Sequence, residues 1–220
     1  MSKDHENAHL TSILILKQRD LMKVDHERIR ILAEVIETRR TVKPHSYSGE
    51  EIDRGIIEKI LESANWAPNH GRTEPWRFKV YCGAGKQRLL ELMKSLYTET
   101  TPQEKYNPAK MDKMEVNCKL SSHIVVIMMK RQEIERVPEI EEVEAVACAV
   151  QNLALTATAY GVSGYWSSGG ITYKDATRES FGLAEKDLVL GFYYLGLATG
   201  ENPEGKRCST IHEKIDWVEE

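Results

Sequence analysis

Apolar positions along the chain change between helical spacing and strand-like patterns. From residue 25 to residue 40 they recur every three or four positions, which predicts a helix that ends at an arginine pair. The same spacing predicts further helices over residues 52–64, 89–96, 111–120 and 139–160. Strand patterns occupy residues 76–82, 123–129, 162–166 and 188–195. This layout predicts an α+β fold, with helices packed around a small, mostly antiparallel sheet.

Four local patterns refine this picture. The unbroken apolar run HIVVIMM at 123–129 indicates a strand that is covered on both faces and lies in the sheet centre. Six alanines in the 139–160 helix allow another helix to approach closely, which predicts a buried central or dimer-interface helix. The sequence SGEE at 48–51 has the form of a capping box and predicts a helix start there. The polar stretch 98–108 predicts a mobile loop that is able to cover a site.

Length and composition predict one soluble domain over residues 25–220, preceded by a helical arm over residues 1–24. No apolar run approaches the roughly 20 residues of a membrane span, and we expect no membrane association. A net charge of −4 argues against a nucleic-acid partner, which would require a basic surface. Four widely spaced cysteines without a C-x-x-C pair predict reduced, buried, structural thiols and a cytoplasmic location.

The common catalytic motifs are absent from the sequence. It contains no G-x-G-x-x-G, P-loop, H-E-x-x-H or G-x-S-x-G pattern. Its seven histidines are scattered without the spacing of metal ligands, so no metal site is predicted. What remains is a set of ordered clusters: ETRRT at 37–41, WAPNHGRTEPWRF at 66–78, YGVSGYWSSGGIT at 160–172 and LGFYYLGLATGENP at 190–203.

Taken in order, these clusters resemble the nitroreductase family of FMN-dependent NAD(P)H oxidoreductases. The resemblance covers roughly residues 28–210 and is strongest to a small subgroup with A-P-D-H, Q-P-W-R-F and W-R-S-G motifs. Each motif alone is weak, whereas the ordered set is specific. The resemblance implies a nitroreductase-like fold, a flavoprotein, and an interlocked homodimer with FMN at the subunit interface.

The resemblance also implies roles for individual residues. Arg39, Arg40 and Thr41 would bind the FMN phosphate and ribityl chain, since guanidinium groups pair well with phosphate. The loop with Trp66, His70 and Glu74 would reach across the interface to FMN held mainly by the other subunit. The stretch along the flavin ring would be Trp166, Ser167, Ser168 and Gly169, with Arg207 as a further phosphate contact.

Each cluster also has a simpler explanation. The arginine pair could complement a helix C-terminus, and Lys206 and Arg207 could be solvated charges of the tail. His70 taken alone is a surface-loop histidine, and the Gly/Ser stretch is a turn that joins a strand to a helix. A Pro75–Trp76 pair is more often a core anchor than a cofactor contact.

Two positions depart from the family pattern. Glu74 replaces the usual glutamine, and an ionised carboxylate there would make reduction of FMN harder. Ser167 replaces the arginine of the closest subgroup and removes a positive charge from the cofactor environment. The loss of this positive charge would alter FMN affinity or the preference between nucleotides.

The implied activity is hydride transfer from NADH or NADPH through flavin N5 to a nitroaromatic, quinone or activated alkene, in a ping-pong cycle. No side chain is assigned as catalytic. One alternative is a specialised branch that dehalogenates its substrate or dismantles the flavin, with clamping residues between Thr98 and Asn117. The others are a non-catalytic or regulatory flavin-binding protein, and an α+β domain without a cofactor.

Overall fold

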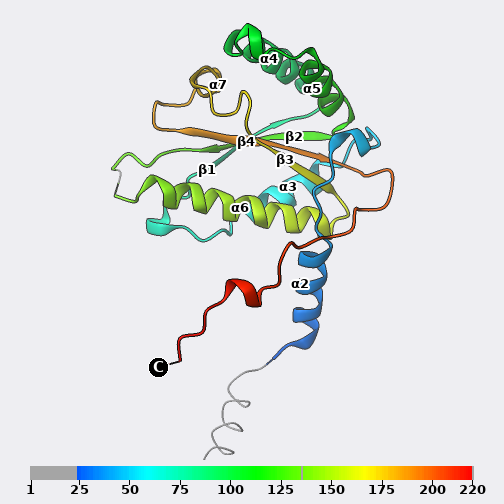
Figure 1. The fold of residues 1–220 in the computed structure, drawn as a ribbon, viewed down its shortest axis with the longest axis vertical. Helices are drawn as coiled ribbons and strands as arrows, with labels where there is room; N and C mark the ends of the chain where they lie inside the picture. Colours follow the sequence, from blue (N-terminus) through cyan, green and yellow to red (C-terminus); the bar gives the residue numbers. More distant parts are fainter. Residues whose placement is uncertain (1–23, 135, 220) are drawn as a thin grey trace, which may run out of the picture. The chain divides into compact units, whose positions relative to one another are not determined.

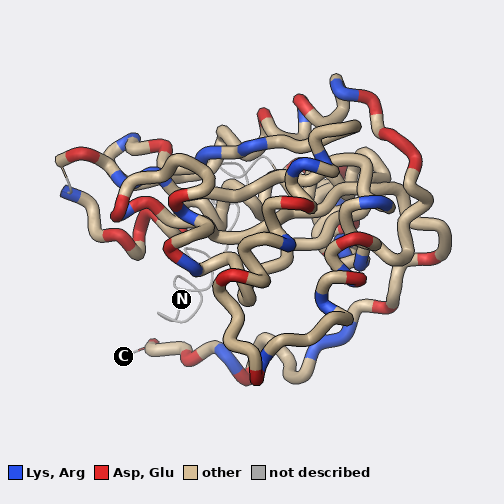
Figure 2. The backbone as a smooth tube through the Cα atoms, turned by 90° about the horizontal axis from the view of Figure 1, so that it is seen from above, with Lys and Arg blue, Asp and Glu red and all other residues tan. Residues whose placement is uncertain are grey.

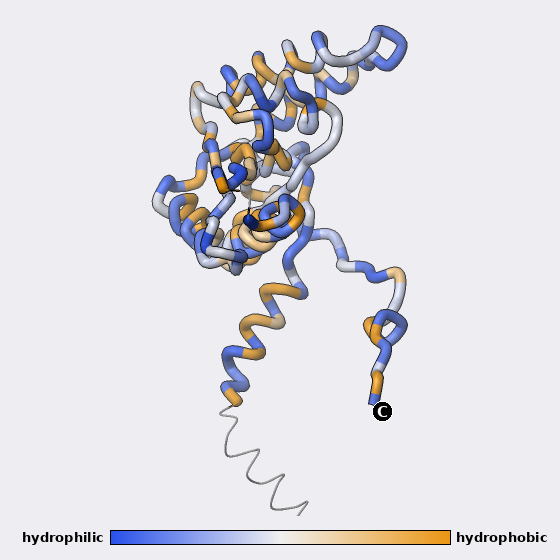
Figure 3. Tube along the Cα trace, turned by 90° about the vertical axis from the view of Figure 1, so that its left-hand side faces the viewer, coloured by the Kyte–Doolittle hydropathy of each residue, from blue (hydrophilic) through white to orange (hydrophobic). Residues whose placement is uncertain are grey.

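The computed structural model describes residues 24–134 and 136–219. The chain divides into two units, residues 1–37 and 38–220, which are treated separately below. Residues 1–23 of the predicted N-terminal arm lie outside the described residues. The first unit contains nearly all of α2 (His26–Thr38), along which hydrophobic and hydrophilic residues alternate (Figure 3). Its side chains Ile29, Leu32 and Ile36 are exposed.

The second unit contains the sheet and the other helices. Its α-helices are α3 (Arg54–Ala64), α4 (Ala84–Thr100), α5 (Pro108–Leu120), α6 (Glu139–Ala159) and α7 (Asp175–Ser180). Its strands are β1 (Trp76–Tyr81), β2 (His123–Met129), β3 (Ser163–Ser167) and β4 (Leu188–Gly196). Short 3-10 helices are η1 (Pro44–Ser46), η2 (His70–Arg72), η3 (Gln103–Lys105) and η4 (His212–Lys214).

The four strands form one antiparallel sheet in the order β1-β2-β4-β3. The α6 and α3 helices cover one face, and α4, α5 and α7 lie on the other (Figure 1). A single parallel bridge between Thr41 and Gly164 adds the segment after α2 to the outer edge of β3. The α+β class and the mostly antiparallel sheet are therefore confirmed.

The sheet has a hydrophobic core on each face because side chains alternate along β2. Val125, Ile127 and Met129 pack with α3 and α6, whereas Ile124, Val126 and Met128 pack with α4. Every residue of β2 is buried, as its unbroken apolar run predicts. A strand in this position belongs in the middle of a three-layer arrangement.

Three sequence predictions are corrected. The Ser48 capping box is wrong, because α3 begins at Arg54 and the Asp53 side chain accepts a hydrogen bond from the Gly55 N–H at 2.8 Å. The stretch 98–108 is partly helical, with α4 extending to Thr100 and η3 and α5 following. The cysteines are not uniformly buried: Cys118 is, whereas Cys82, Cys148 and Cys208 are exposed. The α7 helix has no counterpart in the sequence prediction.

Charged side chains are distributed over the molecule. Basic and acidic residues are interspersed along the chain (Figure 2). Among the described residues, no helix is both long and apolar enough to cross a membrane.

The start of α3 gives a direct test of the corrected capping residue. We expect Asp53→Ala to lower the free energy of unfolding by about 1 kcal/mol, because an N-cap hydrogen bond is lost. Ser48→Ala should change the free energy by less than about 0.5 kcal/mol, because Ser48 is exposed and its hydroxyl only accepts from the Glu50 N–H. Urea unfolding at a fixed protein concentration measures both free energies. A larger loss of stability for Ser48→Ala than for Asp53→Ala would support a capping box at Ser48 instead.

Candidate functional site

Side chains along β3 alternate between the two faces of the sheet, so neighbouring residues of this strand line different cavities. Gly164 and Trp166 face α6, where Gly164 lies over the Tyr193 ring and Trp166 lines a cavity with Ala147. Tyr165 packs with the core on the α4 side, and Ser167 lines a cavity there. The family-like WSSG stretch is therefore split between the two faces of the sheet, with Trp166 on one face and Ser167 on the other.

The side chain of Trp166 is held by an irregularity in β4. The pairing of β2 with β4 shifts at Ile127, so that Leu190 is an extra residue in β4. The Leu190 carbonyl accepts a hydrogen bond from Trp166 Nε1 at 3.1 Å. A Cβ at Gly191 would lie 2.3 Å from that nitrogen, so only glycine leaves room for the indole there. The bulge and the glycine together set the position of Trp166.

A cavity of about 210 Å³, the Arg39 cavity, lies between β3, β4 and α6. Its lining includes Arg39, Thr41, Gln151, Gly164, Trp166 and Tyr193. Burial raises the pKa of the Tyr193 hydroxyl to about 12, and the Arg39 guanidinium opposes that rise. Arg39 is half-buried, and within the described chain it has no carboxylate partner. A cation so placed is suited to an anionic ligand.

Arg40 takes a different position from Arg39. Its Nε donates to the Pro203 carbonyl at 2.9 Å, and its guanidinium lies against Gly205, where a Cβ would be 2.3 Å away. Arg40 thus fastens the segment after β4 to the segment after α2. Arg207 is exposed and donates to the neighbouring Lys206 carbonyl at 3.0 Å. Phosphate contacts by Arg40 and Arg207 stay predictions.

The loop between α3 and β1 carries three residues that were predicted to contact FMN. Within one chain, these residues do not line the cavities next to β3. Trp66 is 82% exposed, and neither it nor His70 or Glu74 lines the cavities that contain Arg39 or Ser167. His70 Nδ1 lies 2.5 Å from Glu141 of α6, which anchors η2. Glu74 is exposed, with a φ of 43°, and its N–H donates to Asn69 Oδ1. Strained residues of this kind persist where the surroundings require them.

The turn after β3 offers unpaired amide groups. Gly169 and Gly170 have φ values of 82° and 56°, and a Cβ at either would meet nothing within 4 Å. In the part of the chain that the structure describes, the N–H groups of Ser168, Gly169 and Gly170 have no hydrogen-bond acceptor. Successive free amides beside open space form a site for an electron-rich, flat or anionic group.

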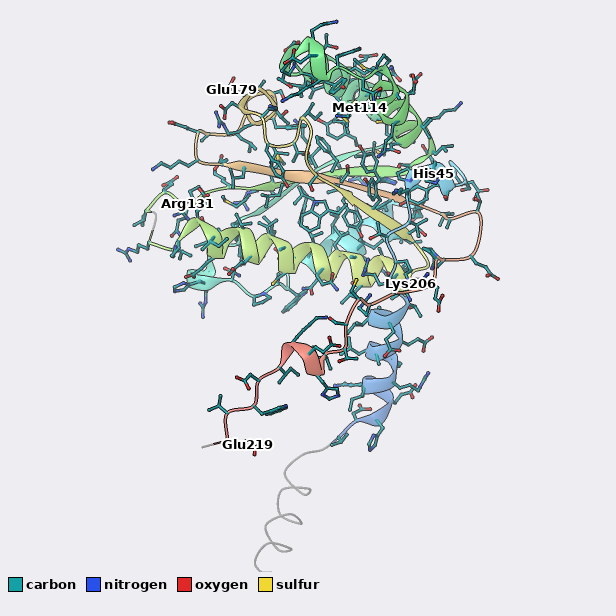
Figure 4. The ribbon with its side chains drawn as sticks, viewed as in Figure 1. His45, Met114, Arg131, Glu179, Lys206 and Glu219 are labelled. Atoms are coloured by element: carbon teal, nitrogen blue, oxygen red, sulfur yellow. The ribbon has the colours of Figure 1, made fainter. Side chains whose placement is uncertain are left out.

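A second cavity of about 200 Å³, the lysine cavity, lies between this turn and the helices α4 and α5. Residues 167–172 form one wall, and the others include Met93 and Tyr97 of α4 and Lys110, Lys113, Met114 and Asn117 of α5. Met114 lies on the side of the sheet opposite α6 (Figure 4). The sequence analysis gave only the range from Thr98 to Asn117 and assigned none of these α5 side chains to a site. The i, i+3, i+4, i+7 spacing of positions 110, 113, 114 and 117 is the signal that could have identified them.

The Arg39 cavity and the turn at residues 168–170 could together hold a flat cofactor with an anionic end. Arg39 supplies a cation and residues 168–170 supply amide donors, both next to β3. Among the described residues, no group of three His, Cys, Asp or Glu side chains is arranged to hold a metal ion. The Arg39 guanidinium and the free amides can bind and orient an anionic or electron-rich group through hydrogen bonds.

Comparison with known proteins gives the class. The model of the nitroreductase family matches residues 36–197, and the chain belongs to this family. It is 31% identical over 71% of its length to "Putative NAD(P)H nitroreductase YdjA" of Escherichia coli (strain K12), and the match covers 80% of that protein. The resemblance seen in the sequence is therefore confirmed at the level of the family.

Solved structures give the same fold. A nitroreductase-like family protein from Bacillus cereus is 29% identical, with a TM-score of 0.71, and the match covers 86% of this chain and 96% of that one. The FMN-dependent nitroreductase NfnB from Mycobacterium smegmatis, solved with NADPH, is 16% identical with a TM-score of 0.66. That match covers 86% of this chain and 99% of the other.

Proposed function

We propose that this protein is an FMN-dependent oxidoreductase that moves hydride from NADPH or NADH to a small electron-poor acceptor in a ping-pong cycle. The acceptor classes are nitroaromatics, quinones and activated alkenes. Bound FMN would supply the hydride-accepting and hydride-donating chemistry at its N5 atom. The names of the relatives, NAD(P)H nitroreductase and FMN-dependent nitroreductase, support this assignment.

The proposal rests on one observation: a guanidinium and a run of backbone amides next to β3 lack an ion-pair or hydrogen-bond partner in the described chain. The guanidinium of Arg39 has no carboxylate partner in the described chain, and the amides of Ser168, Gly169 and Gly170 have no acceptor there. FMN has a dianionic phosphate at one end and a flat ring with electron-rich heteroatoms at the other. Arg39 and Thr41 would bind the phosphate and ribityl end, and the 168–170 turn would bind the ring edge.

The chain's own residues would orient the ring and limit the access of water. Trp166, fixed by the Leu190 carbonyl, would form a rigid wall beside the flavin. Ser167, where the closest subgroup has arginine, leaves the ring environment less positive. No side chain is required as a nucleophile, and the proton for the acceptor would come from solvent.

We further propose that the active unit is a homodimer with FMN at its interface. Trp66, His70 and Glu74 are exposed and stand apart from the Arg39 and lysine cavities of their own chain. Their predicted approach to FMN is therefore consistent with a site that two subunits share. The exposed apolar side chains Ile29, Leu32 and Ile36 of α2 also need cover, which a partner subunit would provide.

Removal of the Arg39 guanidinium tests the phosphate assignment. We expect Arg39→Ala to weaken FMN binding about 10- to 100-fold, because a charge-assisted hydrogen bond contributes about 1.5–3 kcal/mol. Quenching of FMN fluorescence on titration with apoprotein measures the dissociation constant. Arg54→Ala is the matched control, since Arg54 is an exposed arginine paired with Glu58 at 2.7 Å. Equal affinity for wild type and Arg39→Ala would refute the assignment.

Mixed dimers test whether the site is shared. Arg39→Ala and the loop variant Trp66→Ala/His70→Ala should each lose activity alone. When both are refolded together, heterodimers gain one site with an intact Arg39 and an intact loop, so NAD(P)H oxidation with menadione should return. Recovery that tracks the heterodimer fraction supports the interface. If the mixture stays inactive although heterodimers form, then Arg39 and the loop residues Trp66 and His70 act within one subunit.

A further inference from the structure

The lysine cavity indicates which acceptors the protein prefers, an inference that rests on the proposed function. Its volume of about 200 Å³ is small. An engineered apolar cavity of roughly 150 Å³ in another protein holds one benzene molecule, so the present cavity suits one substituted aromatic ring. A nicotinamide dinucleotide is far larger. The cavity can therefore hold a single-ring acceptor whole, whereas only one ring of the dinucleotide would fit in it.

Apolar side chains give the cavity a lining suited to a flat ring. Met93 of α4, Met114 of α5, Ile171 and Phe192 contribute this surface. Methionine side chains adapt to irregular shapes and make favourable contacts with aromatic rings. The wall formed by residues 167–172 includes Ser167, Ser168 and Gly169, which we assign to the flavin ring. A ligand in the cavity would therefore lie next to the flavin.

The charge in the cavity is uniformly positive. Lys110 and Lys113 line it, and among the described residues that do so none is acidic. Neither lysine has a carboxylate partner in the described part of the chain. The Lys110 ammonium lies 5.6 Å from the centroid of the Tyr97 ring, which orients it. Tyr97 is itself fixed, since its hydroxyl oxygen accepts from the Asn107 N–H at 2.9 Å.

The opposite part of the lining is buried and neutral. Asn117 is 7% exposed and Tyr194 is 2% exposed, and both side chains line the cavity. Burial raises the pKa of the Tyr194 hydroxyl, which therefore remains protonated near neutral pH. These groups can hydrogen-bond to an uncharged polar substituent such as a nitro or carbonyl oxygen. The two lysines, which are exposed, can pair with an anionic substituent at the outer end.

We propose that the lysine cavity is the acceptor site and that Lys110 and Lys113 select single-ring, electron-poor aromatic acceptors that carry an acid group. For a nitro compound the first reduction converts the nitro group to a nitroso group and releases one water. NAD(P)H supplies the hydride, which is two electrons and one hydrogen nucleus, and solvent supplies one further proton. The lysines take no part in these transfers and act on binding.

The test compares 4-nitrobenzoate with its neutral analogue 4-nitrobenzamide on the full chain reconstituted with FMN. The readout is the ratio of the two kcat/KM values. We expect Lys110→Gln/Lys113→Gln to lower the benzoate-to-benzamide ratio about tenfold or more, through a raised KM for the anion. Lys119→Gln is the control, because Lys119 is an exposed lysine of α5 outside this cavity. It should leave the ratio unchanged.

A charge-reversal variant distinguishes a change in acceptor preference from a general loss of structure. Lys110→Glu should move the preference towards a cationic nitroaromatic such as 4-nitrobenzylamine, a gain that damage to the fold would not produce. An active double variant with an unchanged ratio, or a reversal that gains nothing with the cation, would overturn the selection by lysine. If wild type oxidises no NAD(P)H with any acceptor, menadione included, then the proposed function fails and this inference fails with it.

Discussion

The site depends on the register between β3 and β4. Side chains alternate along a strand, so a shift of one residue would exchange the faces of Trp166 and Ser167. The pairing of Tyr165 with Tyr194 and of Trp166 with Tyr193 fixes which residue faces α6 and which faces α4 and α5. The extra residue Leu190 and the glycine beside it then make room for the indole. Two cavities with different chemistry thereby lie on either side of one short strand.

Acidic residues at the start of α6 connect this sheet to the loops around it. Glu141 holds His70 of η2 at 2.5 Å, and the buried Glu142 pairs with Arg131, which Figure 4 shows near this end of α6. Arg131 also donates to the Val137 carbonyl, and its backbone N–H donates to the buried Asp187. Loss of one partner would leave a buried charge unpaired, which is strongly destabilising. Glu141 therefore anchors His70, and Glu142 anchors Arg131, while neither carboxylate lines the Arg39 cavity or the lysine cavity.

Much of the fold could be predicted because its hydrophobic pattern is strong. The buried β2, the long α6 and the antiparallel layout all follow from apolar periodicity. The start of α3 could not be predicted in this way, because Ser48 and Asp53 can both cap a helix. Only the backbone conformation shows that Asp53 is the cap. For the candidate site, sequence motifs predicted Arg39 and residues 166–169 as FMN contacts, and the structure places them in or next to β3; the contacts themselves stay predictions. They did not separate Arg39 from Arg40, because the contact of Arg40 with Pro203 joins positions 163 residues apart. Lys113 and Asn117 were missed because a cavity wall built by helix packing has no motif.

The central claim is that the chain binds FMN and passes electrons from a nicotinamide nucleotide through it. An anaerobic visible-absorbance titration of the FMN-reconstituted protein with NADPH, and then NADH, tests this most directly. The account predicts that one of the nucleotides bleaches the flavin band and that menadione or a nitroaromatic restores it. A flavin band that neither nucleotide bleaches would indicate a binding protein instead, and protein that takes up no FMN would contradict the assignment of Arg39 and the 166–169 stretch.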